Sequence, residues 1–142
     1  PTSAMSIKAF LKPAGLDKST GLVTASALKT VSDPFWDTDP GMIEYRKFLA
    51  DYLPAMDPYD SSMVTGYNTG RLMVQILKQC GDDLSRENVM RQAANLKDIE
   101  LPMLLPGIKV TTAPDDFLPY QTLRMHRFNG ATWAVFGDPL TE

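Results

Sequence analysis

The sequence predicts an α/β fold with four helices, one buried strand and a C-terminal β-hairpin. Apolar residues recur at helical spacing in four segments, one short apolar run lacks alternation, and an Asn-Gly pair separates two alternating runs. The buried strand has no parallel partner within the chain, although such a strand normally needs neighbours on both sides. We therefore expect part of a larger fold, with the missing strands upstream.

Composition limits the function classes. The chain has 142 residues, enough for one core, with 44% hydrophobic and 22% charged residues. A net charge of −3 and the lack of a Lys/Arg cluster argue against a nucleic-acid partner. No apolar run approaches the ~20 residues of a membrane span. The start lacks both a signal-peptide pattern and an initiator Met, so we expect a mature or cut product. Cys80 is the sole cysteine, and we expect it to be buried and inert.

The first elements are a helix and the buried strand. A helix is predicted over residues 2–12, with Thr2 or Ser3 as its N-cap, and Pro13 and Gly15 should end it. Residues 22–28 are apolar or small without strict alternation, which is typical of a strand covered on both faces.

A loop and a second helix follow. Turn-forming residues fill 31–39, where the adjacent Phe35 and Trp36 either cap the core or line a cleft. The next helix is predicted over 40–52, because Asp39 is a good N-cap and a proline occupies the first helical position.

The third helix has the clearest boundaries. Asp60 is its expected N-cap and Gly81 its stop. Its wide apolar face suggests packing against a sheet, and comprises Met63, Tyr67, Gly70, Val74 and Leu77 with Met73, Ile76 and Cys80 beside them. The first turn is rich in hydroxyl groups and carries the positive end of the helix dipole. An ordinary capped core helix and a ligand-binding helix end both fit this pattern.

A fourth helix and the hairpin complete the chain. Ser85 caps a helix over 86–96, with Val89, Met90, Ala93 and Leu96 expected to face inward. The helical period then disappears, and 108–110 is at most a short strand. Alternating runs at 122–128 and 131–136 flank Asn-Gly and predict the hairpin.

Motifs of catalysis and metal binding are lacking in the sequence. The sole histidine, His126, lies between Arg124 and Arg127 on an alternating strand, so a surface or packing role is expected. The acidic pairs at 82–83 and 115–116 are typical of solvated turns rather than metal sites. No phosphate-binding loop or nucleophile motif occurs. We therefore expect a binding protein, not an enzyme, with no cofactor and no metal.

Several short motifs point to one family. They are Lys12-Pro-Ala-Gly-Leu16, Gly21-Leu-Val-Thr24, Asp33-Pro-Phe-Trp36, Asp39-Pro-Gly-Met42, Gly66-Tyr67, the run from Lys78 to Val89, Leu104-Leu-Pro-Gly-Ile108 and Phe128-Asn-Gly130. Together they resemble the C-terminal part of type I periplasmic solute-binding proteins, the leucine/isoleucine/valine-binding-protein-like receptors of ABC transporters.

The resemblance implies a domain organisation. Such receptors have two Rossmann-like lobes joined by three crossing segments and are more than twice as long as this chain. Residues 1–24 would belong to the second lobe, and 25–117 to the first lobe with three helices. Residues 118–142 would form the return crossing and the second lobe's hairpin. The resemblance also implies a periplasmic location, ABC permease subunits as partners, and a missing N-terminal portion of the same protein.

The resemblance also suggests where a ligand binds. Thr2 and Ser3 fall where amino-acid-binding members place an acidic residue for the ligand's ammonium group. A hydroxyl there disfavours an α-amino acid and suits a carboxylate, so an aromatic or aliphatic acid is expected. Tyr67 remains either a core residue or a contact. The expected ligand-binding residues are Thr2, Ser3, Ser61, Ser62, Met63 and Tyr67.

The expected function is the substrate-binding component of an ABC transporter. It would bind an amino acid or an aromatic or aliphatic carboxylic acid by closure of two lobes, without catalysis. A ligand-sensing regulatory domain of the same fold is the alternative, and an enzyme is the third. The open edges of the strand at 22–28 also predict an intertwined homodimer of the fragment along that strand.

Overall fold

The N-terminal helical segment is short and irregular. The computed structural model describes residues 6–141, and the described chain begins with Ser6, whose Oγ accepts from the Ala9 N–H. A π-helical turn, η2 (Ile7–Leu11), runs directly into α1 (Lys12–Ala14). The expected caps Thr2 and Ser3 lie outside the described residues.

The end of this helix agrees with the prediction at Gly15 but not at Pro13. Pro13 lies inside α1 rather than ending it, because the start of a new helical turn tolerates a residue without an N–H. Gly15 ends the helix with a φ of 96°, and α2 (Leu16–Ser19) follows. The sharp turn at this point requires the conformational freedom of glycine.

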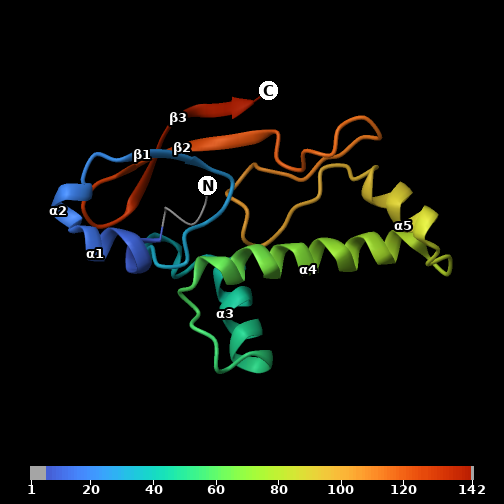
Figure 1. Ribbon diagram of the computed structural model, residues 1–142, viewed down its shortest axis with the longest axis horizontal. Coiled ribbons are helices and arrows are strands. Elements are labelled where there is room, and N and C mark those ends of the chain that lie inside the picture. The colour runs from blue at the N-terminus through green and yellow to red at the C-terminus, as the bar shows by residue number, and fades with distance from the viewer. Residues whose placement is uncertain (1–5, 142) are drawn as a thin grey trace.

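Three antiparallel strands form the sheet seen at the top of Figure 1. Their order is β1 (Val23–Ser26), β2 (Thr122–Phe128) and β3 (Trp133–Thr141). The hairpin prediction is confirmed, although β3 extends further than expected. The expectation of a strand covered on both faces is wrong, whereas the expected parallel partner is indeed lacking among the described residues, since the pairing found is antiparallel. The strand β1 pairs with β2, and the side chains at its start, Leu22 and Val23, are about half exposed.

The starts of the three longer helices agree with the prediction. Asp39 caps α3 (Pro40–Tyr52) by accepting from the Met42 N–H at 2.9 Å. Asp60 caps α4 (Ser61–Cys80) by accepting from the Ser62 N–H at 2.9 Å. The last of these helices, α5 (Arg86–Ala93), is capped by Ser85 and is shorter than the predicted range 86–96.

The covered face of α4 differs from the one predicted. Tyr67 and Cys80 are buried, but Gly70, Val74 and Leu77 are exposed. Ile76, expected beside that face, is also buried, and Val64 and Asn68, which were not expected there, face the core as well. The helix carries apolar residues on two sides, so the helical period alone does not identify the side that is covered.

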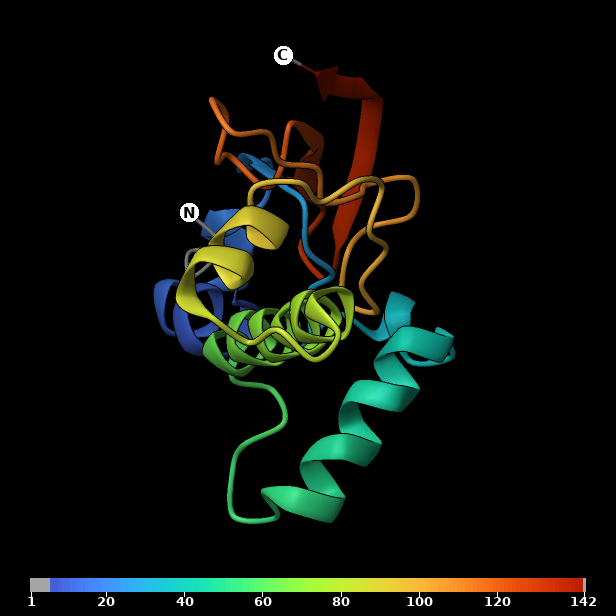
Figure 2. The ribbon, with the colours of Figure 1, turned by 90° about the vertical axis from the view of Figure 1, so that its right-hand side faces the viewer.

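Two hydrophobic clusters form the core. The larger lies among α3, α4 and the irregular segment 96–110, and the smaller packs η2 against the hairpin through Ile7, Leu11, Phe128 and Trp133. Figure 2 shows this irregular segment running above α4. The possible strand at 108–110 is reduced to one bridge between Ile99 and Val110.

Four further side chains were assigned a position from the sequence or lie next to one that was. Met90 was expected to face inward but is 53% exposed, whereas Leu96, beyond the end of α5, is buried. In the loop before α3, Trp36 packs against the larger cluster while Phe35 is 73% exposed. Only one of the two aromatic residues therefore joins the core.

Among the described residues, no helix combines the length and apolarity needed to cross a membrane.

Candidate functional site

A small pocket lies beside the first turn of α4. It is lined by hydroxyl groups, a lysine and aliphatic side chains, namely Ser6, Ser26, Leu28, Lys29, Thr30, Ser61 and Val64. Its volume is about 20 Å³, which is room for about one water molecule or one small polar group. Residues that carry hydroxyl groups, from the start of the described chain, the end of β1 and the segment after it, and the start of α4, therefore surround one mostly apolar pocket near the positive end of a long helix.

The hydroxyl groups are held in place by local bonds. Ser26 lies at the end of β1, where its Oγ accepts from the Leu28 N–H at 2.9 Å. Ser6 is fixed by its own cap interaction with η2. The pocket thus has a rigid wall on the strand side, and Ser61 forms its helix side.

One lining residue of the pocket, Lys29, forms a partly buried ion pair. Lys29 Nζ donates to Asp39 Oδ1 at 2.6 Å and to the Pro102 carbonyl at 2.8 Å. Burial raises the pKa of Asp39, but the hydrogen bond from Lys29 and the Met42 N–H outweigh it and leave the pKa below its ordinary value. Because Asp39 already neutralises this ammonium group, a ligand anion would rely on hydroxyl and N–H donors.

The structure separates the site residues expected on α4. Ser61 reaches the pocket, whereas the Ser62 hydroxyl donates to Asp60 Oδ1 at 2.8 Å and is exposed. Met63 and Tyr67 point to the other side of the helix and line a groove shared with α3. Thr2 and Ser3 lie outside the described residues.

Tyr67 has a packed and bonded environment. Its ring lies 5.3 Å from that of Tyr45 and 5.1 Å from that of Phe48, and its hydroxyl donates to Glu44 at 3.0 Å. Burial and this bond to a carboxylate raise the pKa of Tyr67 to about 12. The hydroxyl therefore stays protonated at neutral pH and acts as a donor.

Sequence reasoning missed the strand side of the pocket and a polar residue of α4. Asn68 is 1% exposed, and neither its amide oxygen nor its nitrogen has a hydrogen-bond partner among the described residues. Ser61, Val64 and Asn68 follow one another at i, i+3 and i+7, so they share one face of α4. Ser61 and Asn68 are seven residues apart, and this spacing in the sequence could have shown that the two side chains share a helix face.

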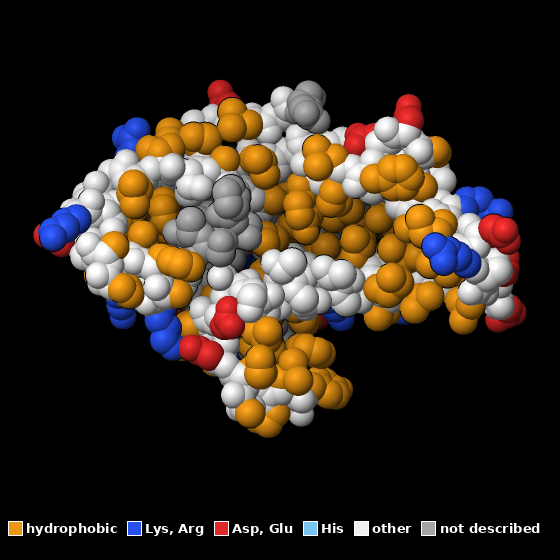
Figure 3. Space-filling view, viewed as in Figure 1, with side chains coloured by type: hydrophobic (Ala, Val, Ile, Leu, Met, Phe, Trp, Pro, Cys, Tyr) orange, Lys and Arg blue, Asp and Glu red, His pale blue; other side chains and the backbone are white. Residues whose placement is uncertain are grey.

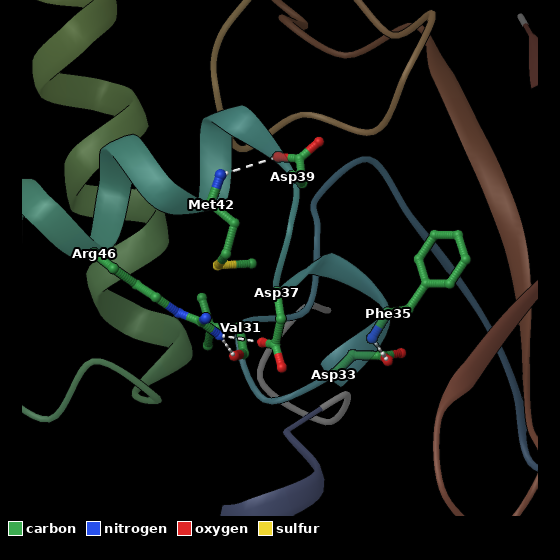
Figure 4. A network of polar contacts seen from close by, with 7 residues as sticks. All are labelled: Val31, Asp33, Phe35, Asp37, Asp39, Met42 and Arg46. Atoms are coloured by element: carbon green, nitrogen blue, oxygen red, sulfur yellow. Dashed lines mark hydrogen bonds and ion pairs between the residues drawn. The ribbon is translucent and has the colours of Figure 1, made fainter.

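The loop between β1 and α3 is fixed by polar contacts, shown in Figure 4. Asp33 accepts from the Phe35 N–H at 2.9 Å, and its other oxygen accepts from the Trp133 N–H at 2.9 Å. Arg46 donates to Asp37 at 2.8 Å and to the Val31 carbonyl at 3.4 Å. These bonds tie the loop both to α3 and to the hairpin.

His126 lies inside the protein, near Asp33. The ring is 2% exposed, and the Trp133 backbone lies close to it. Burial lowers the pKa of His126, an effect opposed by the Asp33 charge. Its place agrees with the expected packing role. In the described part of the chain, no group of three or more His, Cys, Asp or Glu residues is arranged to hold a metal ion.

Comparison with known proteins gives one structural likeness. No family model and no curated protein matches the sequence. Among solved structures, "a branched chain amino acid ABC transporter from Thermus thermophilus with bound valine" matches with a TM-score of 0.64 and 14% identity. The match covers 89% of this chain and 35% of that chain. The chain thus spans about a third of the length of that protein, and over this part it shares the periplasmic-binding-protein fold.

Proposed function

We propose that the chain is the C-terminal portion of a solute-binding component of an ABC transporter. The observation that carries the proposal is the likeness of its fold to a transporter protein that binds valine. The solute would be an amino acid or an aromatic or aliphatic carboxylic acid, bound by closure of two lobes without catalysis. Such a component would act in the periplasm, with permease subunits and an N-terminal portion of the same protein.

The proposed lobes follow the division expected from the sequence. Residues 1–24 and 118–142 would belong to the second lobe, and 25–117 to the first. The pocket supports this division, because Ser6 comes from the first of these segments and Ser61 from the middle one. A pocket between two lobes is the place where closure would enclose a ligand.

Ser61 is the strongest candidate contact. Ser61 lines the pocket, and hydroxyl and N–H donors at a helix start suit a carboxylate. Thr2, Ser3, Ser62, Met63 and Tyr67 stay predicted contacts. The pocket holds only one small polar group, so the rest of the solute would be bound by polypeptide beyond these residues.

A thermal-shift assay tests the proposal. Valine, leucine, benzoate and phenylacetate would be added to the longer polypeptide encoded by the reading frame that contains these residues. A bound solute at 100 times its Kd stabilises the folded state by about 2.7 kcal/mol, which raises the melting temperature. Ser61→Ala should reduce the shift, whereas Thr65→Ala, an exposed change one turn later, should not. A panel without any shift would contradict the proposal.

A further inference from the structure

An exposed ion pair joins two segments that are 49 positions apart in the chain. Lys8 Nζ, in η2, donates to Asp57 Oδ2 at 2.5 Å, and both side chains are about half exposed. Figure 3 shows basic and acidic side chains side by side at the surface where the N-terminal helices approach the loop before α4. The other carboxylate oxygen of Asp57 accepts from the Tyr59 N–H at 3.0 Å. The carboxylate is therefore held by its own loop and bound by a lysine from another segment.

The ring of Tyr59 supports this pair. Lys8 Nζ lies 5.5 Å from the centre of the ring, and Arg46 Cζ of α3 lies 5.8 Å from it. A cation at this distance from an aromatic ring is attracted to it. The Lys8 ammonium group is thus drawn to the ring as well as to the carboxylate, and both partners lie in the loop between α3 and α4.

The pair connects the two hydrophobic clusters. Lys8 follows Ile7 and precedes Leu11, which pack η2 against the hairpin in the smaller cluster. Asp57 lies between α3 and α4, whose buried residues belong to the larger cluster. The pair therefore bridges parts of the protein that are anchored in different cores.

The same two segments form opposite sides of the pocket. Ser6 lines the pocket and caps η2, two residues before Lys8. On the other side, the Asp60 N–H donates to the Asp57 carbonyl at 3.0 Å, and Ser61, the next residue, lines the pocket from α4. Each serine is thus tied by local bonds to one partner of the ion pair.

We propose that Lys8 and Asp57 are positioning residues, which set the separation of Ser6 and Ser61 and thereby the affinity of the pocket for its solute. The part of the inference that concerns affinity rests on the proposed function. An exposed pair contributes little to folding and is screened by salt. The separation of the two serines, and with it solute binding, should therefore respond to ionic strength while the fold remains intact.

A distance measurement on the 142-residue protein tests the positioning role without any solute. Spin labels are attached to Lys12→Cys on α1 and Thr65→Cys on α4, both exposed, in a Cys80→Ala background. In pulsed electron spin resonance, Lys8→Met should lengthen and broaden the distance distribution. Lys8→Arg keeps the positive charge and should restore the original distribution.

A matched control and a change of salt separate this pair from others. Lys47→Met removes an exposed pair with Asp51 within α3, at 2.6 Å, and should leave the distance unchanged. Salt at 1 M, where the Debye length is about 3 Å, should lengthen the distance in the parent protein. The same salt should have little effect on Lys8→Met, because the pair is already lost.

Solute affinity gives the second readout. The probe is the member of the thermal-shift panel with the largest response, among valine, leucine, benzoate and phenylacetate, and calorimetric titration measures its Kd with the longer polypeptide. At low salt, Lys8→Met should raise Kd about two- to fivefold, whereas Lys47→Met should not. At 1 M salt the difference between Lys8→Met and the parent protein should disappear.

Two results would overturn the inference. The first is an unchanged distance in Lys8→Met, and the second is a rise in Kd that is equally large at low and high salt, which would indicate a direct contact of Lys8 with the solute. The two readouts also separate this inference from the proposed function. A lengthened distance without a response to any solute would support the positioning of the serines and reject the solute-binding role, and a solute response with an unchanged distance would do the reverse.

Discussion

Lys29 Nζ lies 2.6 Å from Asp39 Oδ1, and the lysine side chain is only 7% exposed. The same ammonium group donates to the Pro102 carbonyl, so one cation joins the segment after β1, the start of α3 and the irregular segment 96–110. Lys29 Nζ also lies 5.5 Å from the centre of the Trp36 ring, so the cation contacts the loop before α3 as well. Four segments of the chain therefore converge on Lys29.

Removing this cation should be costly. Lys29→Met leaves the Asp39 carboxylate and the Pro102 carbonyl without their donor, and we expect the free energy of unfolding to fall by about 3 kcal/mol. Lys8→Met is the matched control, because Lys8 pairs with Asp57 at an exposed position, and it should cost less than about 1 kcal/mol. Urea unfolding measures both. Equal losses would show that the Lys29 pair is no stronger than an exposed one.

Asp33 should be sensitive to loss of its second acceptor oxygen. Asp33→Asn keeps one acceptor but turns an NH₂ group toward a backbone N–H, at a side chain that is buried and bonded to both Phe35 and Trp133. We expect a loss of about 2 kcal/mol in urea unfolding. Asp37→Asn, at a half-exposed partner of Arg46, should cost less than about 1 kcal/mol. The reverse order would contradict the importance of the Asp33 bonds.

His126 should make stability depend on pH. Burial lowers its pKa below the ordinary value of 6.5, with Asp33 opposing the shift and Arg124 adding to it. The unfolded chain therefore binds a proton at a higher pH than the folded protein, and the free energy of unfolding should fall as the pH falls below about 6.5.

Thermal melts between pH 7 and pH 5 test this dependence. His126→Leu and His126→Gln should both flatten it, because neither side chain titrates. Asp39 affects stability at a lower pH. Because its pKa is lowered in the folded protein, the stabilisation by its ionised carboxylate is lost only as the pH falls from about 4 through the folded pKa. An unchanged slope in both variants would rule out His126 as the source.

Two glycines of the helices should respond in opposite ways to alanine. A Cβ at Gly41 would lie 2.1 Å from the Pro102 carbonyl oxygen, so Gly41→Ala should destabilise the protein by about 2 kcal/mol or more. In the 142-residue chain, Gly66→Ala meets no atom within 4 Å and should stabilise α4 by about 1 kcal/mol. Differential scanning calorimetry measures both changes. Equal signs would contradict the close contact at Gly41.

Local chemistry made the helix boundaries predictable from sequence. Asp39 and Asp60 cap their helices as expected, and Gly81 ends α4 with a φ of 60°. The hairpin was equally accessible, because Asn129 and Gly130 lie between two alternating runs. Each of these features depends on residues close together in the chain.

Contacts between distant segments were not predictable in the same way. The pairing of β1 with β2 joins Thr24 to His126, and no local pattern encodes that choice. The two apolar sides of α4 have similar periodicity, so the covered side depends on which segments the fold brings there. Likewise the sequence identified Ser61 as a candidate, but not that Ser6 and Ser26 would lie beside it.

The pairing of β1 with β2 also affects the order of events during synthesis. The hydrogen bond from the Trp133 N–H to Asp33 joins residues that are 100 positions apart. The strand β1 likewise pairs with β2, which is synthesised about as much later. At the usual rate of translation, that delay is about 5 to 20 s. The helices α3, α4 and α5 depend on bonds between residues close in the chain. We therefore expect the sheet to form after them, and until β2 is available the edge of β1 stays unpaired.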